Sequence, residues 1–149
     1  TMTDPSVAAV YGDLIYVSKD QPDRVVRDWR AGEFSPAKLR RGWMPPHPTL
    51  YVRRSVFESV GRFDTTLRIA ADYDWMLRLL LAGHRLAYIP QVQVRMRTGG
   101  ASNRSVGNIM RKSGEDFAAL RRNGFSVAGA TTTLMAKNLR KLPQLVRRR

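Results

Sequence analysis

Residues 61–79 read GRFDTTLRIAADYDWMLRL, and this stretch indicates more about the fold than any other part of the chain. Apolar side chains recur there and just beyond at three- and four-residue steps: Ile69, Tyr73, Met76, Leu77 and Leu80. That spacing places them on one face of a helix, and the glycine at position 83 is a typical helix end. The pattern predicts a helix over residues 69–82.

Two carboxylates, Asp72 and Asp74, open this helix. Side chains two residues apart point about 200° apart around a helix, so these two acids cannot face one ligand. Asp74 is spaced to pair with Arg78 one turn later, whereas Asp72 has no partner at helical spacing. In a purely structural alternative, both acids complement the positive end of the helix dipole, worth about 0.3–1 kcal/mol each.

Upstream of this helix, the sequence predicts two paired strands and a short helix. Residues 14–17 and 25–29 are rich in β-branched and aromatic side chains, which favours strands, and residues 11–13 carry a turn signal before them. Ser35 followed by Pro36 is typical of a helix start, and this helix is expected to end at the glycine that follows Arg41.

On either side of residues 61–83, further short elements are expected. Residues 44–48 contain three prolines and cannot form regular structure, because each proline lacks a donor and has a fixed φ. A strand over residues 50–52 and a helix over 54–60, closed by Gly61, follow that segment. Two strands, residues 86–89 and 92–96, are predicted around Pro90.

Two helices are predicted to end the chain. The first begins at a cap provided by Ser102 or Asn103 and runs to about Asn123. The second is amphipathic, and its apolar side chains are Leu134, Met135, Leu139, Leu142 and Val146, with Pro143 as a kink or stop. Strands interspersed with helices predict a mixed α/β architecture, with a first region over residues 1–105 and a basic helical region over 106–149.

Composition limits the classes of protein that remain. With 149 residues and 43% hydrophobic side chains, the chain is long enough for one compact domain. The absence of cysteine excludes disulfides, thiolate metal sites and cysteine nucleophiles. The formal net charge is +14, and most of the excess lies after residue 100, where eleven basic side chains face two acidic ones. Such an excess indicates a polyanionic partner.

The region around Asp72 resembles the acceptor side of inverting family 2 glycosyltransferases, which have the GT-A fold. In that family a Gly-x-Phe-Asp turn precedes an acidic pair that opens a Leu/Arg-rich helix, and here the match is to residues 61–64 and 71–78. Residues 10–16 and 44–54 are also similar, and residues 97–102 match the family's Arg-x-Gly-Gly-x-Ser closure. The resemblance covers residues 7 to about 105 and implies the acceptor-side half of a GT-A fold, with a mixed sheet.

The resemblance implies that Asp72 is the general base, which removes a proton from an acceptor hydroxyl as that hydroxyl attacks the anomeric carbon. The family usually has Glu-Asp where this chain has Ala71-Asp72, so no help from a neighbouring acid is expected. His47, in the proline-rich segment, is expected to line the acceptor cleft or, alternatively, to be an ordinary surface histidine. Trp43 and Trp75 are expected to be packing residues rather than sugar platforms.

The strand before residues 99–100 supplies the remaining candidates for substrate binding. Arg95 and Arg97 share one strand face and are expected either to reach the donor diphosphate or to lie on a solvated face. Gly99 and Gly100 would let the backbone approach a ligand closely.

Nothing in the chain resembles the nucleotide-binding half of the family, so we expect an acceptor-side portion that cannot transfer sugar alone. Asp72-Tyr73-Asp74 has the form of an Asp-x-Asp metal motif, but in the family that motif lies in a loop after a strand. No metal ligand is therefore expected in this chain. The Mg²⁺ or Mn²⁺ of the family is expected only in the full-length enzyme, through a motif absent here.

The expected partners are a nucleotide-sugar donor and a saccharide or lipid-linked acceptor, as in cell-surface polysaccharide or glycolipid biosynthesis. Residues 137–149 have the basic amphipathic pattern of a helix at an anionic membrane surface, or of a solvated terminus. These expectations imply a cytoplasmic protein, peripheral at the inner membrane face. A partial fold would also expose apolar surface, through which two copies could form a homodimer.

Two alternatives from other functional classes stay open. A nucleic-acid-binding module would suit the charge of +14, but the sequence contains no helix-turn-helix, zinc or RNA-binding signature, so nucleic acid is not the expected partner. A non-catalytic interaction domain of the same fold would keep the architecture and lack the chemistry.

Overall fold

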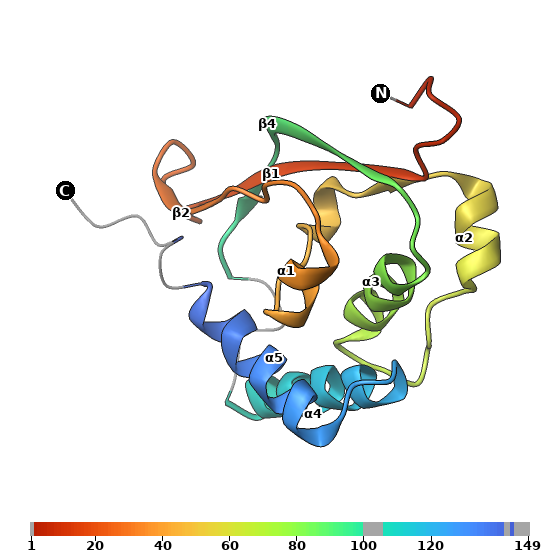
Figure 1. The fold of residues 1–149 in the computed structure, drawn as a ribbon. Coiled ribbons are helices and arrows are strands. Elements are labelled where there is room, and N and C mark those ends of the chain that lie inside the picture. The colour runs from red at the N-terminus through yellow and green to blue at the C-terminus, as the bar shows by residue number, and fades with distance from the viewer. Residues whose placement is uncertain (1, 100–105, 142–143, 145–149) are drawn as a thin grey trace.

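The structure is a computed structural model, and it describes residues 2–99, 106–141 and 144. In this part of the chain, a four-stranded sheet is combined with five α-helices and one 3-10 turn, which confirms the mixed α/β prediction (Figure 1). The elements are β1 (Ala9–Val17), β2 (Val25–Trp29), α1 (Pro36–Arg40), η1 (His47–Thr49), β3 (Tyr51–Val52), α2 (Arg54–Val60), α3 (Ala71–Leu81), β4 (Leu86–Arg97), α4 (Val106–Arg122) and α5 (Val127–Leu139).

Strand β1 is the centre of the sheet. Along one edge it pairs in parallel with β4 from Ala9 to Val17. On its other edge it pairs antiparallel with β3 at Ala9 and Val10, and with β2 from Leu14 onward. The predicted pairing of the strands at residues 14–17 and 25–29 is confirmed.

Two local strand predictions were wrong. Residues 11–13 do not form a turn, because β1 continues through them, and the side chain of Asp13 finds its hydrogen bonds in the fold. The two strands expected around Pro90 are one strand, β4, whose register against β1 shifts between Gly12 and Leu14. An edge strand with a bulge accommodates a proline without ending, since the missing N–H need not pair.

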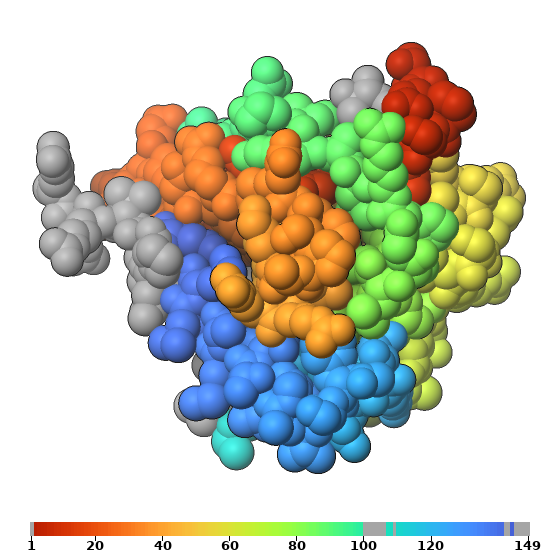
Figure 2. Space-filling view, in the orientation of Figure 1, coloured from red at the N-terminus to blue at the C-terminus, as the bar shows by residue number. Residues whose placement is uncertain are grey.

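The helices pack beneath the sheet. Figure 1 shows α1 and α3 under β1 and β4, with α4 and α5 in the layer farthest from the sheet. In Figure 2 the orange surface around α1 fills the space between the sheet and the blue C-terminal helices. The core combines side chains from β1, α3, α4 and α5, so the two regions predicted at 1–105 and 106–149 pack together; examples are Tyr11, Leu77, Leu79, Leu120 and Ala130.

Helix α3 is the central helix, and it follows the predicted residues 69–82 closely, running from Ala71 to Leu81. The ion pair expected within it is present, with Arg78 Nε 3.0 Å from Asp74 Oδ2. Trp75 is buried in it and donates from Nε1 to the carbonyl of Gly61 at 2.6 Å. That bond ties the loop before α3 to the helix.

The other helix signals were largely confirmed. The Ser35 side chain accepts a hydrogen bond from Lys38 N at the start of α1, and α2 has the predicted bounds, with Gly61 as its C-cap. Two C-terminal helices, α4 and α5, are present as predicted, but α5 begins earlier than its predicted apolar residues 134–146 and ends at Leu139. None of the described helices is long and apolar enough to cross a bilayer. The proposed caps Ser102 and Asn103, and Leu142, Pro143 and Val146, lie outside the described residues.

Candidate functional site

Asp72 and His47, which are 25 positions apart in the sequence, lie side by side. Asp72 is the second residue of α3 and His47 the first residue of η1, and Asp72 Oδ2 is 3.9 Å from His47 Nδ1. Their side chains are 43% and 42% exposed, so both groups are open to solvent. The separation is longer than a direct hydrogen bond, which leaves room for a bridging water or a substrate hydroxyl.

The position of His47 follows from its proline-rich surroundings and from Thr49. The single proton of the Thr49 hydroxyl is shared between the carbonyls of Pro46 at 2.8 Å and Gly12 at 3.0 Å, and the hydroxyl oxygen accepts from the backbone N–H of Gly12. Gly12 lies in the middle of β1, so these bonds fasten η1 to the centre of the sheet. His47 therefore projects from a rigid segment rather than from a mobile loop.

One oxygen of Asp72 binds in the first turn of its own helix, and a carboxylate from α4 binds the backbone just before that helix. The carboxylate of Glu115 accepts from the backbone N–H of Ile69 at 2.8 Å and of Ala70 at 2.9 Å. Burial opposes ionisation of Glu115, but these hydrogen bonds prevail and hold its pKa below the usual value. Asp72 Oδ1 accepts only from the N–H of Tyr73, at 2.7 Å, among the bonds of the described residues. Its Oδ2 faces His47.

Asp74, unlike Asp72, is fully engaged in structural contacts, as its four-residue spacing from Arg78 predicted. It is buried; besides the Arg78 ion pair, its Oδ1 accepts from Asn123 Nδ2 at 3.1 Å. Asp74 thus holds α3 to the end of α4 and cannot join Asp72 on a ligand. Within the described ranges, no group of three His, Asp or Glu side chains could hold a metal ion, so these residues do not fit the cation that the family resemblance implies for a full-length protein.

An exposed aromatic ring, Phe63, completes the surroundings of Asp72 and His47. Its side chain is 38% exposed, and its ring centre is 6.3 Å from that of His47. Phe57 and Trp75 support it from behind, with ring centres 5.8 and 5.5 Å away. Trp75 and Trp43 are themselves buried, as expected for packing residues. We call Asp72, His47 and Phe63 together the Asp72 surface.

The Asp72 surface contains two residues that the sequence proposed for the site and one, Phe63, that it did not. Phe63 belongs to the Gly-x-Phe-Asp turn of the family resemblance, but that motif does not show that the ring is exposed beside His47, which is a property of the fold. Glu115 was missed for a similar reason, since its partners Ile69 and Ala70 are more than 40 positions away.

Arg95, Arg97 and Gly99 are exposed at the end of β4 and beyond it. Arg95 donates from Nη2 to the carbonyl of Pro22, in the turn between β1 and β2, at 3.1 Å. No interaction recorded for the described residues links these three to the Asp72 surface. Gly100 lies outside the described residues.

Asp13 is a buried carboxylate that the sequence analysis placed in a turn. Its oxygens accept from the N–H of Ala31 at 2.8 Å, from the hydroxyl of Tyr88 at 2.7 Å and from Arg30 Nη1 at 3.2 Å. Burial and the hydrogen bond to Asp13 raise the pKa of the Tyr88 hydroxyl. The carboxylate thus fastens the segment after β2 to the sheet, and we assign it a structural role.

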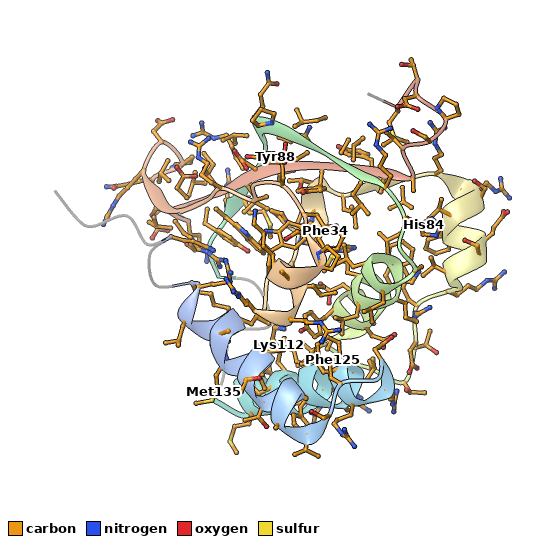
Figure 3. The ribbon with its side chains drawn as sticks, viewed as in Figure 1. Phe34, His84, Tyr88, Lys112, Phe125 and Met135 are labelled. Carbon is orange, nitrogen blue, oxygen red and sulfur yellow. The ribbon has the colours of Figure 1, made fainter. Side chains whose placement is uncertain are left out.

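Two hollows lie elsewhere on the surface. One of about 440 Å³ is lined by residues of α1, the end of α3 and the start of α5, including Leu39, Leu81 and Phe125 (Figure 3). The other, of about 330 Å³, lies beside Phe34 and Tyr88. Neither is lined by Asp72 or His47.

Comparison with known proteins adds no assignment: no protein-family model matches the chain, and no curated protein matches it.

Proposed function

We propose that this chain forms the acceptor side of an inverting glycosyltransferase, with Asp72 as the general base. The observation that carries the proposal is the half-exposed Asp72 carboxylate, of which one oxygen accepts from the Tyr73 N–H while the other faces His47. A base needs such an arrangement, in which the carboxylate is held rigidly but is not consumed by structural hydrogen bonds.

In the proposed reaction, the acceptor hydroxyl lies against Asp72 Oδ2. Its oxygen attacks the anomeric carbon of the donor, the bond from that carbon to the diphosphate oxygen breaks, and the hydroxyl proton passes to Asp72. His47 stands where it can hydrogen-bond the same hydroxyl or, through a water, the carboxylate. The exposed ring of Phe63 offers an apolar face for the carbon-bound hydrogens of a sugar.

The nucleotide-sugar site and its Mg²⁺ or Mn²⁺ are proposed to lie in a nucleotide-binding half outside this chain, and no step above depends on a metal. Arg95, Arg97, Gly99 and Gly100 are proposed as contacts to the donor. A saccharide or lipid-linked acceptor of cell-surface polysaccharide or glycolipid synthesis remains the proposed acceptor class.

A membrane-facing α5 is part of the same proposal. Val127, Met135 and Leu139 are exposed and lie within about 120° of one another around α5. Met135 lies on the outer side of the helix in Figure 3. Such a face, followed by a basic segment, suits a peripheral protein at the inner membrane face or a contact between two copies.

The decisive experiment measures sugar transfer from nucleotide-sugars by a protein that combines this chain with the proposed nucleotide-binding half. Asp72→Asn keeps the size of the side chain and removes its basicity. We expect transfer to fall by about 10²–10⁴-fold while nucleotide-sugar binding is retained. Glu58→Gln is the matched control, because Glu58 is an exposed acid on α2 paired with Arg54.

Transfer by Asp72→Asn within about threefold of wild type would exclude the base role. Donor binding without any transfer by the wild type would favour a non-catalytic domain. Steeply salt-dependent binding of DNA or RNA, with no donor binding, would favour the nucleic-acid alternative.

A further inference from the structure

A second feature, away from the Asp72 surface, is a cluster of four cationic side chains from β2, α4 and the end of α5. We call Arg27, Lys112, Lys137 and Lys141 the basic cluster. Figure 1 shows that β2 and the C-terminal end of α5 lie on the same side of the molecule. In Figure 3, Lys112 of α4 lies beside α5.

Two of the four cations share a single carboxylate. Lys137 Nζ is 2.7 Å and Lys112 Nζ 3.0 Å from the same oxygen, Asp116 Oδ2. Lys137 is only 14% exposed and Asp116 only 4%. The Lys137 ammonium also lies 3.3 Å from the ring centre of Tyr73, which is a cation–π contact with the core helix α3.

Lys141 is close enough to act on this pair, and Arg27 is close enough to act on Lys141, whose carbonyl accepts from the N–H of Gln144 at 3.3 Å. Partial desolvation lowers the pKa of Lys141, and the positive charges of Lys112 and Arg27 lower it further. Asp116 is the one carboxylate that opposes this effect among the described residues. Arg27 is held in place, since its guanidinium carbon lies 4.9 and 4.7 Å from the ring centres of Tyr16 and Trp29. Its Nε donates to Gln144 Oε1 at 2.7 Å.

The cluster therefore combines four cations with one carboxylate. Asp28, on the same strand as Arg27, is paired with Arg30 instead. Residues 100–105 and 142–149 contain no Asp or Glu in their sequence, so those segments have no acidic side chain to neutralise the excess. Burial lowers the pKa of Lys137 to about 7; Asp116 opposes this effect, while the charges of Lys112 and Lys141 add to it.

A purely structural role explains only part of this arrangement. The pair of Lys137 with Asp116 is enough to join α5 to α4, and adding further cations around one carboxylate opposes folding unless an anion compensates them. Lys112 is partly exposed and Lys141 is exposed, so an anion has access from solvent.

We propose that the basic cluster binds a phosphate or diphosphate group. Arg27 supplies paired N–H donors of the geometry that phosphate oxygens accept, and the lysines supply point charges. The phosphate would belong either to a soluble molecule or to a lipid headgroup, because the chemistry of recognition is the same. The proposal does not depend on sugar transfer, so it can fail or succeed independently of the proposed function.

The experiment titrates the 149-residue chain with inorganic pyrophosphate at low ionic strength, following amide chemical shifts. We expect saturable shifts centred on β2 and the ends of α4 and α5. The double variant Arg27→Gln/Lys141→Gln should weaken binding by at least about tenfold. The matched control Lys19→Gln/Arg54→Gln removes the same charge from other surfaces and should stay within about twofold.

A parallel arm measures sedimentation with phosphatidylglycerol and phosphatidylcholine vesicles. Binding of pyrophosphate identifies a soluble phosphate ligand, whereas cluster-dependent binding of phosphatidylglycerol vesicles alone identifies a headgroup; either result supports the site. Equal weakening in both double variants, or no saturable binding in either arm, would overturn it.

If the double variant does not fold, the wild-type chain still tests the proposal. Acetylation of Lys141 by an amine-reactive reagent should then slow at least about threefold with pyrophosphate, whereas that of Lys19 should not. If pyrophosphate left the acetylation rate of Lys141 unchanged, the result would count against the site.

Discussion

Replacing Gly42 by alanine tests whether α5 is docked onto the rest of the fold. Gly42 follows α1 with φ +74°, and a Cβ there would meet backbone atoms of α5: the N atom of Lys137, the Thr133 carbonyl oxygen at 2.5 Å and the Lys137 Cα at 2.8 Å. Backbone atoms inside a helix cannot rotate away. The methyl group would therefore push α5 from α1.

Gly83 provides a matched control. It follows α3 with φ +75°, nearly the same backbone conformation, but a Cβ there would have no atom within 4 Å. Alanine in the left-handed region costs about 1–2 kcal/mol, and the reduced entropy of the unfolded chain returns about 0.4–1 kcal/mol. Gly83→Ala should therefore lower the free energy of unfolding by about 1 kcal/mol.

Gly42→Ala should lower the free energy of unfolding by considerably more than Gly83→Ala. Besides the same backbone term, overpacking costs about 1–3 kcal/mol. Displacing α5 also weakens two hydrogen bonds that join it to α1, from Thr133 Oγ1 to the Arg40 carbonyl and from Arg140 Nε to the Arg41 carbonyl, each 2.9 Å long. At about 1 kcal/mol per bond, the total with the backbone term is about 4–6 kcal/mol.

The assay is urea unfolding followed by tryptophan fluorescence, because Trp43 is buried next to Gly42. The informative quantity is the difference between the two variants, expected to be about 3–5 kcal/mol. A difference below about 0.5 kcal/mol would refute the close contact of α1 with α5.

Two further predictions concern buried charges. Because the pKa of Lys137 is lowered from 10.5 to about 7, the unfolded chain holds more protons than the folded one between these values, so stability should rise with pH across that window, on the order of 4 kcal/mol. In urea unfolding from pH 7 to 9.5, Lys137→Met should flatten this rise of the free energy of unfolding. Equal rises in the wild type and the variant would contradict the lowered pKa of Lys137. Asp74→Asn should lower the free energy of unfolding by about 1–3 kcal/mol because it removes the buried partner of Arg78. Asp64 pairs with the exposed Arg122, so Asp64→Asn should lower the free energy of unfolding by less than about 1 kcal/mol. Equal losses of stability in the two variants would show that burial of Asp74 does not strengthen its ion pair.

Local sequence signals predicted the helices well. The bounds of α2, the serine cap of α1 and the ion pair inside α3 depend on residues within one or two helical turns of one another. Helix geometry also predicted that Asp72 and Asp74 point in different directions, since the angle between neighbouring side chains on a helix does not depend on the fold.

Strand boundaries depended on contacts that no local signal contains. Tyr11-Gly12-Asp13 resembles a turn when taken alone, yet it continues β1, because Asp13 finds its partners at Ala31 and Tyr88. Pro90 similarly does not end β4, since the bulge occurs at an edge strand.

The sequence by itself determined the class of architecture, the central helix and the fact that Asp72, unlike Asp74, has no partner at helical spacing. The tertiary structure alone decided what surrounds that acid: it placed His47 and Phe63 beside Asp72 and set Glu115 against the backbone just before the helix. It also turned Lys137, which the sequence assigned to a basic outer face, inward onto Tyr73 and Asp116. The reason is physical: local spacing sets which way a side chain points, but burial and charge balance depend on residues brought together from distant parts of the chain.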